Sequence, residues 1–501
     1  MNGTFWIELC TYRGEGNANL IVASSKERSV IRLKKSATVV NETEDLKRAE
    51  KRLRQEVNFI KGTVTGFLGF YVDVPEIILC SEVEIRRLAQ KIRSYRPENR
   101  LEKDIIGGYA TKYPDYTFLS HHLSIAKNKP TYCVEIKPKQ GYIYNIENQL
   151  PKCQYCLMQY YKVEKRNIDS PSQYCPFDLF SGEELRMKKA LESLMNAPQN
   201  NFRLFRGGEL INDMKETSIE KLLSNFLSNE DDSRMLLIKI MMEALTRPFD
   251  SNSNPPKRRS MNFDGIQVAR SIDVNLLNKA RSLLQRSNQK CQMKEISQEG
   301  LIKKGSVLER IYKMQQLHDC PSDVIIAIYN EFILFFGTNA EELIHEDLAD
   351  LSIIYASTDD IFRSRKKRLE KWIVNQKSAI GSSDKFKQIS NNEPLNVNQI
   401  LEKSIIGSLS VNDCFDVLGN YLLFSLARDC SIMMTFQELD KESLEHIDPL
   451  HIITASESKT FVFDVKVLDL DLKSLSCVEK HLSKKIDVLK STISYLENQQ
   501  V

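Results

Sequence analysis

Two lysines stand two residues apart at the end of one apolar segment, in the run C-V-E-I-K-P-K-Q-G that begins at Cys133. The segment Tyr132–Ile136 is apolar and rich in β-favouring residues, so the sequence predicts a strand there. Pro138 donates no backbone hydrogen bond, and we expect the strand to end at it. Lys137 and Lys139 would then project from one strand end, where lysine can bind phosphate as a point charge. An ordinary solvated strand end is the alternative.

Two carboxylates and a lysine follow a second predicted strand, Phe461–Leu468, near the C-terminus. Alternation would place Asp469, Asp471 and Lys473 on one side of an extended chain. Carboxylate oxygens are hard ligands that suit Mg²⁺, and the lysine suits a neighbouring phosphate. A charged strand exit without a ligand is the alternative. In the first segment, Glu135 is placed to orient the ammonium group of Lys137 or of Lys139.

A glycine-containing turn near the N-terminus offers a further phosphate contact, because glycines let backbone N–H groups approach phosphate oxygens closely. A returning strand is predicted at Leu20–Ala23, after a first strand at Phe5–Cys10, and another at Ser29–Lys34. That third strand carries Arg32, where a kinase-like fold brings a cation to the nucleotide phosphates. A plain hairpin and a surface ion pair are the alternatives. The turn consists of Gly14, Glu15, Gly16, Asn17, Ala18 and Asn19.

Cys153 and Cys156 form a C-x-x-C, which is half of a tetrahedral zinc site. Cys133 and Cys175 lie on either side, but no second clean pair completes the set. Packed, reduced thiols are the alternative. The 11 cysteines are scattered, and the first residues lack the basic and apolar regions of a secretory signal. We therefore expect reduced thiols and a cytoplasmic or nuclear location.

The composition sets limits on the class of protein. A length of 501 residues predicts two to four domains or lobes. The hydrophobic share of 42% and the charged share of 27% are ordinary for a globular protein. Because the net charge is only +3, a polyanion site must come from local clustering. No apolar run approaches the ~18 residues that cross a bilayer, so we expect no membrane partner.

The elements that must position these groups are strands and helices early in the chain and mostly helices in the middle. The segment from Ile219 to about Phe415 is predicted to be mainly helical. A further helix should begin within Phe180–Glu184, capped by Ser181. The other predicted helices are Thr43–Asn58, Glu82–Tyr95, Asp273–Leu284, Val307–Gln316 and Asp323–Phe336.

Two basic runs, Lys257–Arg259 and Lys366–Arg368, suggest a nuclear localisation patch or a nucleic-acid contact. Nucleic-acid binding through them would weaken steeply as salt rises. Solvated surface is the favoured alternative, because few aromatic residues are interleaved with these charges. We expect no obligate nucleic-acid partner.

Seven short segments, in the same order, resemble the inositol-pentakisphosphate 2-kinases, the family that makes inositol hexakisphosphate (phytate). Together they extend from near Tyr12 to Lys473, and between roughly Ile211 and Phe415 the resemblance is slight. The segments are Gly14–Leu20, Arg96–Arg100, Cys133–Gly141, Tyr174–Gly182, Gln199–Arg203, Arg428–Met433 and Val467–Lys473.

The resemblance implies an α/β (α+β), two-lobed, kinase-like fold with ATP at the cleft between the lobes. The β-rich N-lobe would occupy residues 1–125, with a hinge around Leu119–His121. The larger C-lobe would occupy residues 126–501 and contain a mainly helical insert at about 215–415. The motif set of ordinary protein kinases, with H-R-D, D-F-G and V-A-I-K, is absent from the sequence.

The resemblance also implies roles for particular residues. Asp429 would be the base for the 2-hydroxyl of inositol 1,3,4,5,6-pentakisphosphate, and Asp469, helped by Asp471, would hold Mg²⁺. The ATP contacts would be Arg32, Lys137, Asp469 and the Gly14–Asn19 turn. The substrate phosphates would be held by Arg100, Lys139, Lys162, Asn200, Asn201 and Lys473. Each charged hydrogen bond of this kind contributes about 1.5–3 kcal/mol.

The sequence departs from the family pattern at three positions. Relatives carry a tyrosine, and some an arginine, where this chain has His481 and Cys477. A histidine of relatives corresponds to Met158, beside the C-x-x-C. The resemblance implies a monomer that uses ATP and inositol pentakisphosphate. A catalytically inactive scaffold that binds inositol polyphosphates is the alternative function.

Overall fold

The computed structural model describes residues 9–24, 26–36, 43–123, 129–144, 150–211, 233–251, 254–287, 302–377, 397–456 and 459–499. Most of the predicted first strand, Phe5–Cys10, lies outside the described residues. So do residues 212–232, 288–301 and 378–396 of the predicted helical insert.

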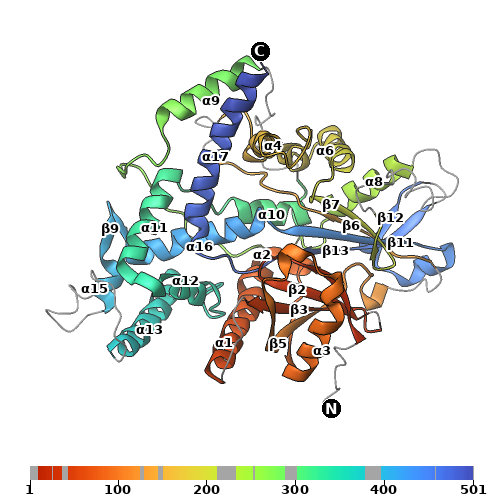
Figure 1. Ribbon diagram of the computed structural model, residues 1–501, viewed down its shortest axis with the longest axis horizontal. Helices are drawn as coiled ribbons and strands as arrows, with labels where there is room; N and C mark the ends of the chain where they lie inside the picture. Colours follow the sequence, from red (N-terminus) through yellow and green to blue (C-terminus); the bar gives the residue numbers. More distant parts are fainter. Residues whose placement is uncertain are drawn as a thin grey trace.

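A five-stranded antiparallel sheet is built from the first part of the chain, in the order β1-β2-β3-β5-β4 (Figure 1). Alternate residues of β3 are buried, so Ile31 and Leu33 enter a core while Arg32 lies on the opposite face. The central strand β5 was not among the predicted strands. The bounds are β1 Thr11–Glu15, β2 Asn19–Ser24, β3 Ser29–Ser36, β4 Glu76–Cys80 and β5 Asp104–Pro114.

Two helices cover this sheet, and both were predicted. Helix α3 (Glu82–Ile92) begins with a capping box in which Ser81 and Glu84 satisfy each other's backbone N–H groups. Its apolar side packs on the face that carries Ile31 and Leu33. Helix α1 (Thr43–Phe59) is joined to β3 on the Arg32 side by an ion pair between Lys34 and Glu56.

A second, six-stranded sheet has the order β12-β13-β11-β6-β7-β8. All its pairings are antiparallel, with Ile136 opposite both Ile432 and Phe202, and Ser431 opposite Leu468. The ends of β6 and β13 and the beginnings of β7 and β11 therefore lie side by side, at one end of the strands. We call this end of the six-stranded sheet its edge. The bounds are β6 Tyr132–Ile136, β7 Phe202–Arg206, β8 Glu209–Leu210, β11 Ser431–Glu438, β12 Ile452–Thr454 and β13 Thr460–Leu468.

Helices from the rest of the chain pack around this sheet and extend away from it (Figure 1). Helix α16 runs through the middle and is buried over nearly its whole length. The C-terminal helix α17 contacts both α4 and α9. The remaining bounds are α2 Thr65–Leu68, α4 Gln154–Glu164, α5 Pro176–Leu179, α6 Glu184–Asn196, α8 Ser233–Thr246, α9 Val274–Arg286, α10 Val307–Gln315, α11 Ser322–Phe336, α12 Ala340–Leu348, α13 Thr358–Lys377, α15 Val397–Glu402, α16 Val411–Ala427 and α17 Cys477–Asn498. The short strands β9 (Ser404–Ile406) and β10 (Leu409–Ser410) form a separate hairpin.

The chain is therefore a mixed helix-and-sheet protein, as predicted. The predicted helix cap at Ser181 is wrong: α6 begins at Glu184 with Glu183 as its N-cap residue, and the Ser181 hydroxyl donates to the Asp178 carbonyl instead. One apolar stretch, Ser322–Leu348, reaches membrane-spanning length and hydropathy, contrary to the sequence expectation. It is weak evidence for a span, since Gly337 at φ 59° separates α11 from α12 and both helices pack on α16.

Candidate functional site

The edge of the six-stranded sheet collects most of the predicted site residues. Lys137 follows β6 and Asp469 follows β13, while Asp429 lies in the turn between α16 and β11. The backbone N–H of Lys137 donates to the carbonyl of Asn201, just before β7. Antiparallel pairing thus brings together groups that are separated by hundreds of residues in the sequence.

Lys137 and Asp469 form an ion pair across this edge, with Nζ 2.6 Å from Oδ2. Ser431 Oγ lies 2.8 Å from the same carboxylate oxygen and 3.0 Å from Glu135. Glu135 attracts Lys137 through its charge, but its hydrogen-bonding partners are Arg203, at 3.3 Å, and Ser431. Asp469 is the carboxylate that orients Lys137.

The backbone at this edge is turned into unusual conformations. Asp469 has φ 62° and Lys139 has φ 63°, in the left-handed region. The predicted alternation after β13 is therefore wrong, since β13 ends at Leu468 and Asp469 is not extended. The three side chains instead find three partners: Asp469 pairs with Lys137, Asp471 with Arg32, and Lys473 with Asp429. The Lys473 Nζ lies 3.6 Å from Asp429 Oδ2.

Asp429 is held as a carboxylate. Burial opposes its ionisation, but Arg428, Lys473 and Lys139 keep its pKa below the ordinary value. It can therefore accept a proton or a hydrogen bond at neutral pH.

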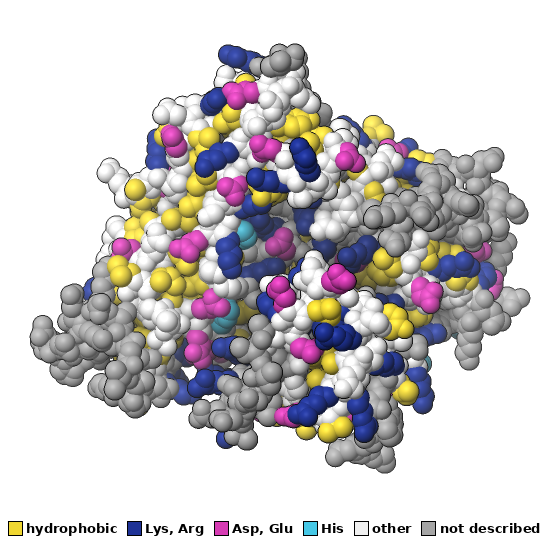
Figure 2. Space-filling model, in the orientation of Figure 1, with side chains coloured by type: hydrophobic (Ala, Val, Ile, Leu, Met, Phe, Trp, Pro, Cys, Tyr) yellow, Lys and Arg dark blue, Asp and Glu magenta, His cyan; other side chains and the backbone are white. Residues whose placement is uncertain are grey.

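Lys139 lies among several other cations. Burial, and then repulsion from Lys137, Lys162 and Arg428, lower its pKa to about 8, against the opposite influence of Asp429. Figure 2 shows Lys and Arg side chains gathered, with acidic ones among them, around a hollow in the middle of the visible face. Convergent cations around Lys139 suit a ligand that carries several negative charges.

The glycine turn reaches the same region from the five-stranded sheet. Asp471 accepts from Arg32, and from Asn19 Nδ2 at 3.2 Å, which ties the turn to the segment after β13. A Cβ at Gly14 or Gly16 would meet nothing within 4 Å, so the protein's own packing does not require glycine at either position. Open space above the turn fits the approach of a nucleotide phosphate.

The Glu15 side chain is engaged within the protein, so the predicted phosphate contact of this residue depends on its backbone. Its carboxylate is fully buried between Lys35 and Arg96, with Arg96 Nε 2.8 Å from Oε1. Arg96 also donates to the carbonyls of Arg100 and Lys103. The Glu15 side chain is thus unable to contact a nucleotide, and it anchors the turn instead.

The predicted substrate residues are divided between the two sheets. Lys162 lies near the edge of the six-stranded sheet, where its Nζ donates to Gln199 at 2.5 Å. Asn200 is exposed in the turn before β7. Asn201 is buried and its amide donates to the Tyr155 hydroxyl at 3.0 Å, so it supports the turn rather than presenting its amide nitrogen to a ligand. Arg100, on a 3₁₀ turn Glu98–Arg100, lies beside the five-stranded sheet.

Several residues at the site were not found from the sequence. Gln315 of α10 is fully buried and accepts from the Gly141 N–H at 2.8 Å. Its amide donates to the carbonyls of Lys139 and Ala427. Gln315 therefore connects the loop that contains Lys137 and Lys139, called here the lysine loop, to the residues just before Asp429. Ser431 and Arg428 stand inside a motif that was noticed, but neither was assigned a role.

Two of the three positions that depart from the family pattern, His481 and Cys477, lie beside Asp429 and Lys473. His481 is placed with Nδ1 2.8 Å from the Tyr421 hydroxyl, and burial with Arg428 lowers its pKa to about 3. Burial raises the pKa of the Cys477 thiol, whose Sγ lies 3.8 Å from Ser425 Oγ. Both side chains are therefore neutral at pH 7.

Two donor sets suit metals. Asp469 and Asp471 present carboxylate oxygens at the sheet edge, each next to a cation that could contact phosphate, which fits Mg²⁺. The thiols of Cys153, Cys156 and Cys175 lie within 4.8 Å of one another. Cys133 is not in that group among the described residues; it lies buried on β6. Three thiols fit three positions of a zinc tetrahedron.

Comparisons with known proteins show the family of the chain. A sequence model described as inositol-pentakisphosphate 2-kinase matches residues 12–486. An inositol-pentakisphosphate 2-kinase of Danio rerio is 27% identical over 493 residues, covering 92% of this chain and 88% of the relative. Proteins of the same name from Drosophila melanogaster and Arabidopsis thaliana are 25% and 27% identical over 50% and 44% of this chain, and over 55% and 60% of their own lengths.

Proposed function

The chain belongs to the inositol-pentakisphosphate 2-kinase family and is a kinase, and from this premise we propose its substrate and the roles of its residues. The substrate is inositol 1,3,4,5,6-pentakisphosphate, the donor is ATP, and the product is inositol hexakisphosphate. The observation that carries the proposal is the meeting of Lys137, Lys139, Asp429 and Asp469 at one sheet edge.

The phosphate contacts divide into two groups. Lys137, Arg32 and the backbone of the glycine turn hold the nucleotide phosphates, with Lys137 oriented by Asp469. Lys139, Lys162, Lys473 and Arg100 hold the phosphates of the inositol ring. A ligand with so many charges relieves the repulsion that lowers the pKa of Lys139.

The acceptor hydroxyl is activated by Asp429. This residue is ionised and lies beside Lys139 and Lys473, so its carboxylate accepts the proton of the 2-hydroxyl as the oxygen attacks. Lys473, 3.6 Å from Asp429, keeps that carboxylate ionised and directed.

Mg²⁺, when bound by Asp469 and Asp471, would neutralise charge on the nucleotide phosphates. The fit rests on the hard oxygen ligands at this edge. Lys137 and Arg32 pair with the same two carboxylates, so each cation is already directed toward the place where the phosphates would lie.

The lobe boundaries also enter the proposal. The five-stranded sheet lies within residues 1–125 and the six-stranded sheet within residues 126–501. We assign the first to a nucleotide-binding N-lobe and the second, with its helical insert, to a C-lobe. The monomeric state and a cytoplasmic or nuclear location belong to the same proposal.

A panel assay tests the activity. The full chain is incubated with Mg·ATP and inositol tris-, tetrakis-, pentakis- and hexakisphosphates, and products are identified by NMR. We expect the pentakisphosphate to give hexakisphosphate and ADP in equal amounts. Turnover of less phosphorylated inositols would show that neutral His481 and Cys477 relax the selection. Binding without any turnover would favour the inactive scaffold instead.

Metal analysis of the same sample tests the thiol cluster. We propose that Cys153, Cys156 and Cys175 hold one zinc ion as thiolates in a structural site. About one equivalent of zinc is expected, lost in Cys175→Ser. A metal-free wild-type protein of full activity would establish packed thiols.

A further inference from the structure

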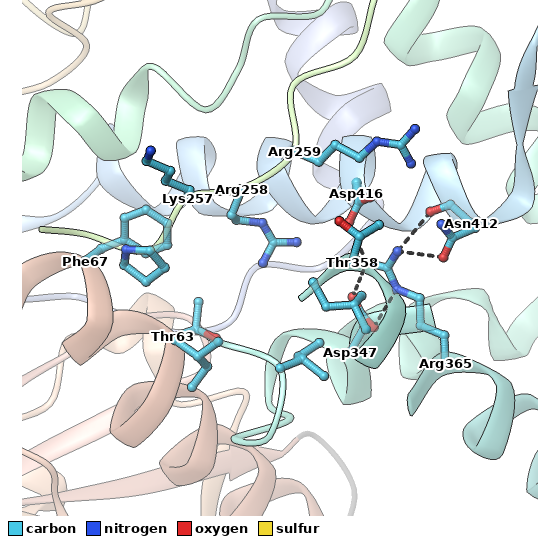
Figure 3. A pocket seen from close by; sticks show the side chains of 14 residues that line it. Thr63, Phe67, Lys257, Arg258, Arg259, Asp347, Thr358, Arg365, Asn412 and Asp416 are labelled. Carbon is cyan, nitrogen blue, oxygen red and sulfur yellow. Dashed lines mark hydrogen bonds and ion pairs between the residues drawn. The ribbon is translucent and has the colours of Figure 1, made fainter. Parts of the chain in front are cut away.

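A cavity that shares no lining residue with the catalytic edge lies where the basic run Lys257–Arg259 meets helices α13 and α16 (Figure 3). Its volume is about 50 Å³, and a water needs about 10–15 Å³ by a similar measure, so it can hold a few waters or one tetrahedral oxyanion. Of the basic run, Arg258 turns inward, while Arg259 pairs at the surface with Asp413 at 2.7 Å.

The acidic residues on the cavity wall are already neutralised. Arg365 forms a two-bond pair with Asp347, at 2.9 Å for each bond, and contacts Asp416 at 2.6 Å. Arg368 pairs with the same Asp347. The remaining donors of Arg365 bind the backbone and side-chain oxygens of Asn412. These carboxylates are therefore occupied by cations other than Arg258.

Arg258 is the charge left without an anion. Its Nε donates to Asn420 Oδ1 at 2.6 Å, and no carboxylate of the described chain lies within ion-pair distance of its guanidinium. Burial lowers its pKa despite the more distant Asp416 and Asp347. A forked guanidinium that faces a cavity is suited to a tetrahedral oxyanion.

The inward position of Arg258 is accommodated by the helix beneath it. A Cβ at Gly419 of α16 would lie 2.9 Å from Arg258 Nη2, so the glycine leaves the room that the guanidinium occupies. Of the four basic residues that line the cavity, Arg259 pairs with Asp413 and Arg365 pairs with Asp347 and Asp416, which leaves Lys257 and Arg258 without a carboxylate partner in the described part of the chain. The surplus of positive charge favours an anion over water alone.

We propose that this cavity binds a phosphate group, held by Arg258, as a site separate from the catalytic edge. The group comes either from inorganic phosphate or from one arm of an inositol polyphosphate whose ring stays at the mouth. Lys257 and Thr358 are exposed on the cavity wall and would face such a ring.

Hydrogen–deuterium exchange of the full chain tests the site locally, with inorganic phosphate against chloride at matched ionic strength. Amides of residues 254–263 and of the first turn of α13 should exchange about tenfold more slowly when phosphate is at ten times its dissociation constant. Arg258→Met should abolish this protection, and Arg258→Lys should leave part of it. Arg270→Met, which removes an exposed charge elsewhere, should retain it.

Repeating the measurement in Lys139→Met with inositol hexakisphosphate distinguishes the two sources of the phosphate group, the free ion and an inositol polyphosphate. Protection there assigns the site to an inositol polyphosphate, and protection by inorganic phosphate alone assigns it to the free ion. No protection in the wild type, or equal protection in Arg258→Met, would overturn the proposal and leave the cavity to water. Neither result depends on the turnover assay.

Discussion

Lys137 Nζ lies 2.6 Å from Asp469 Oδ2, although the two residues are 332 positions apart in the chain. The pair joins the ends of β6 and β13, and Ser431 at the start of β11 donates to the same carboxylate. Three strands are thus connected through one carboxylate at the point where we place the nucleotide phosphates.

Asp469→Asn should lower kcat at least about a hundredfold, because the amide is a poor ligand for Mg²⁺ and no longer balances Lys137. Steady-state turnover at saturating Mg·ATP measures the loss. Ser431→Ala is the matched comparison, since it removes a donor to the same oxygen and keeps the charge. Equal rates for Asp469→Asn and the wild type would remove Asp469 from the metal site.

The affinity for inositol pentakisphosphate should fall as pH rises through about 8. Lys139 binds phosphate in its charged form, and its pKa is lowered to about 8, so deprotonation above that pH removes a charged contact. We expect the Kd to rise about tenfold between pH 7 and pH 9.5. Calorimetric titration measures it.

Lys139→Arg supplies the control for this pH dependence, because a guanidinium stays charged throughout the range. The variant should show a flatter profile than the wild type. Parallel profiles for the two proteins would mean that another group causes the loss of affinity.

Gln315→Leu should raise KM for the inositol phosphate and lower kcat together, by about tenfold in kcat/KM. The fully buried amide binds the carbonyls of Lys139 and Ala427, so its loss frees the lysine loop and the approach to Asp429 at once. Gln315→Glu keeps the acceptor to the Gly141 N–H and should recover part of the substrate affinity. A variant that loses only thermal stability would reduce Gln315 to a packing role.

Glu15→Gln should cost about 3–5 kcal/mol of unfolding free energy, because it leaves Lys35 and Arg96 buried beside a neutral amide. Glu82→Gln, in an exposed pair with Arg86, should cost at most about 1 kcal/mol. Urea unfolding of the two variants compares the costs.

The pKa of Glu15 is lowered in the folded state, so its contribution to the free energy of unfolding is present above about pH 4.3 and disappears as pH falls further.

Local patterns predicted much of the secondary structure. The strand at Tyr132–Ile136 was confirmed to the residue, since an apolar run stops at Lys137 and a proline follows. Helix α10 was predicted to within one residue from its apolar spacing. Such features depend on neighbours in the sequence, which is why they can be predicted without the fold.

Features that depend on distant partners were not predicted. Gln315 meets Lys139 across 176 positions, and nothing in its own segment marks it. Glu15 stands in the glycine turn, and nothing in the turn indicates that Arg96, 81 positions away, binds its carboxylate. The positive φ of Asp469 removed the alternation on which one prediction rested.

Asp429→Asn gives the most direct test of the central claim that these groups form one phosphoryl-transfer site. Single-turnover rates with Mg·ATP and inositol pentakisphosphate, measured beside calorimetric binding of the same substrate, separate chemistry from affinity. We predict a fall in rate of about 10²–10⁴-fold with substrate Kd changed by less than about threefold. An unchanged rate would contradict the assignment of Asp429 as the base.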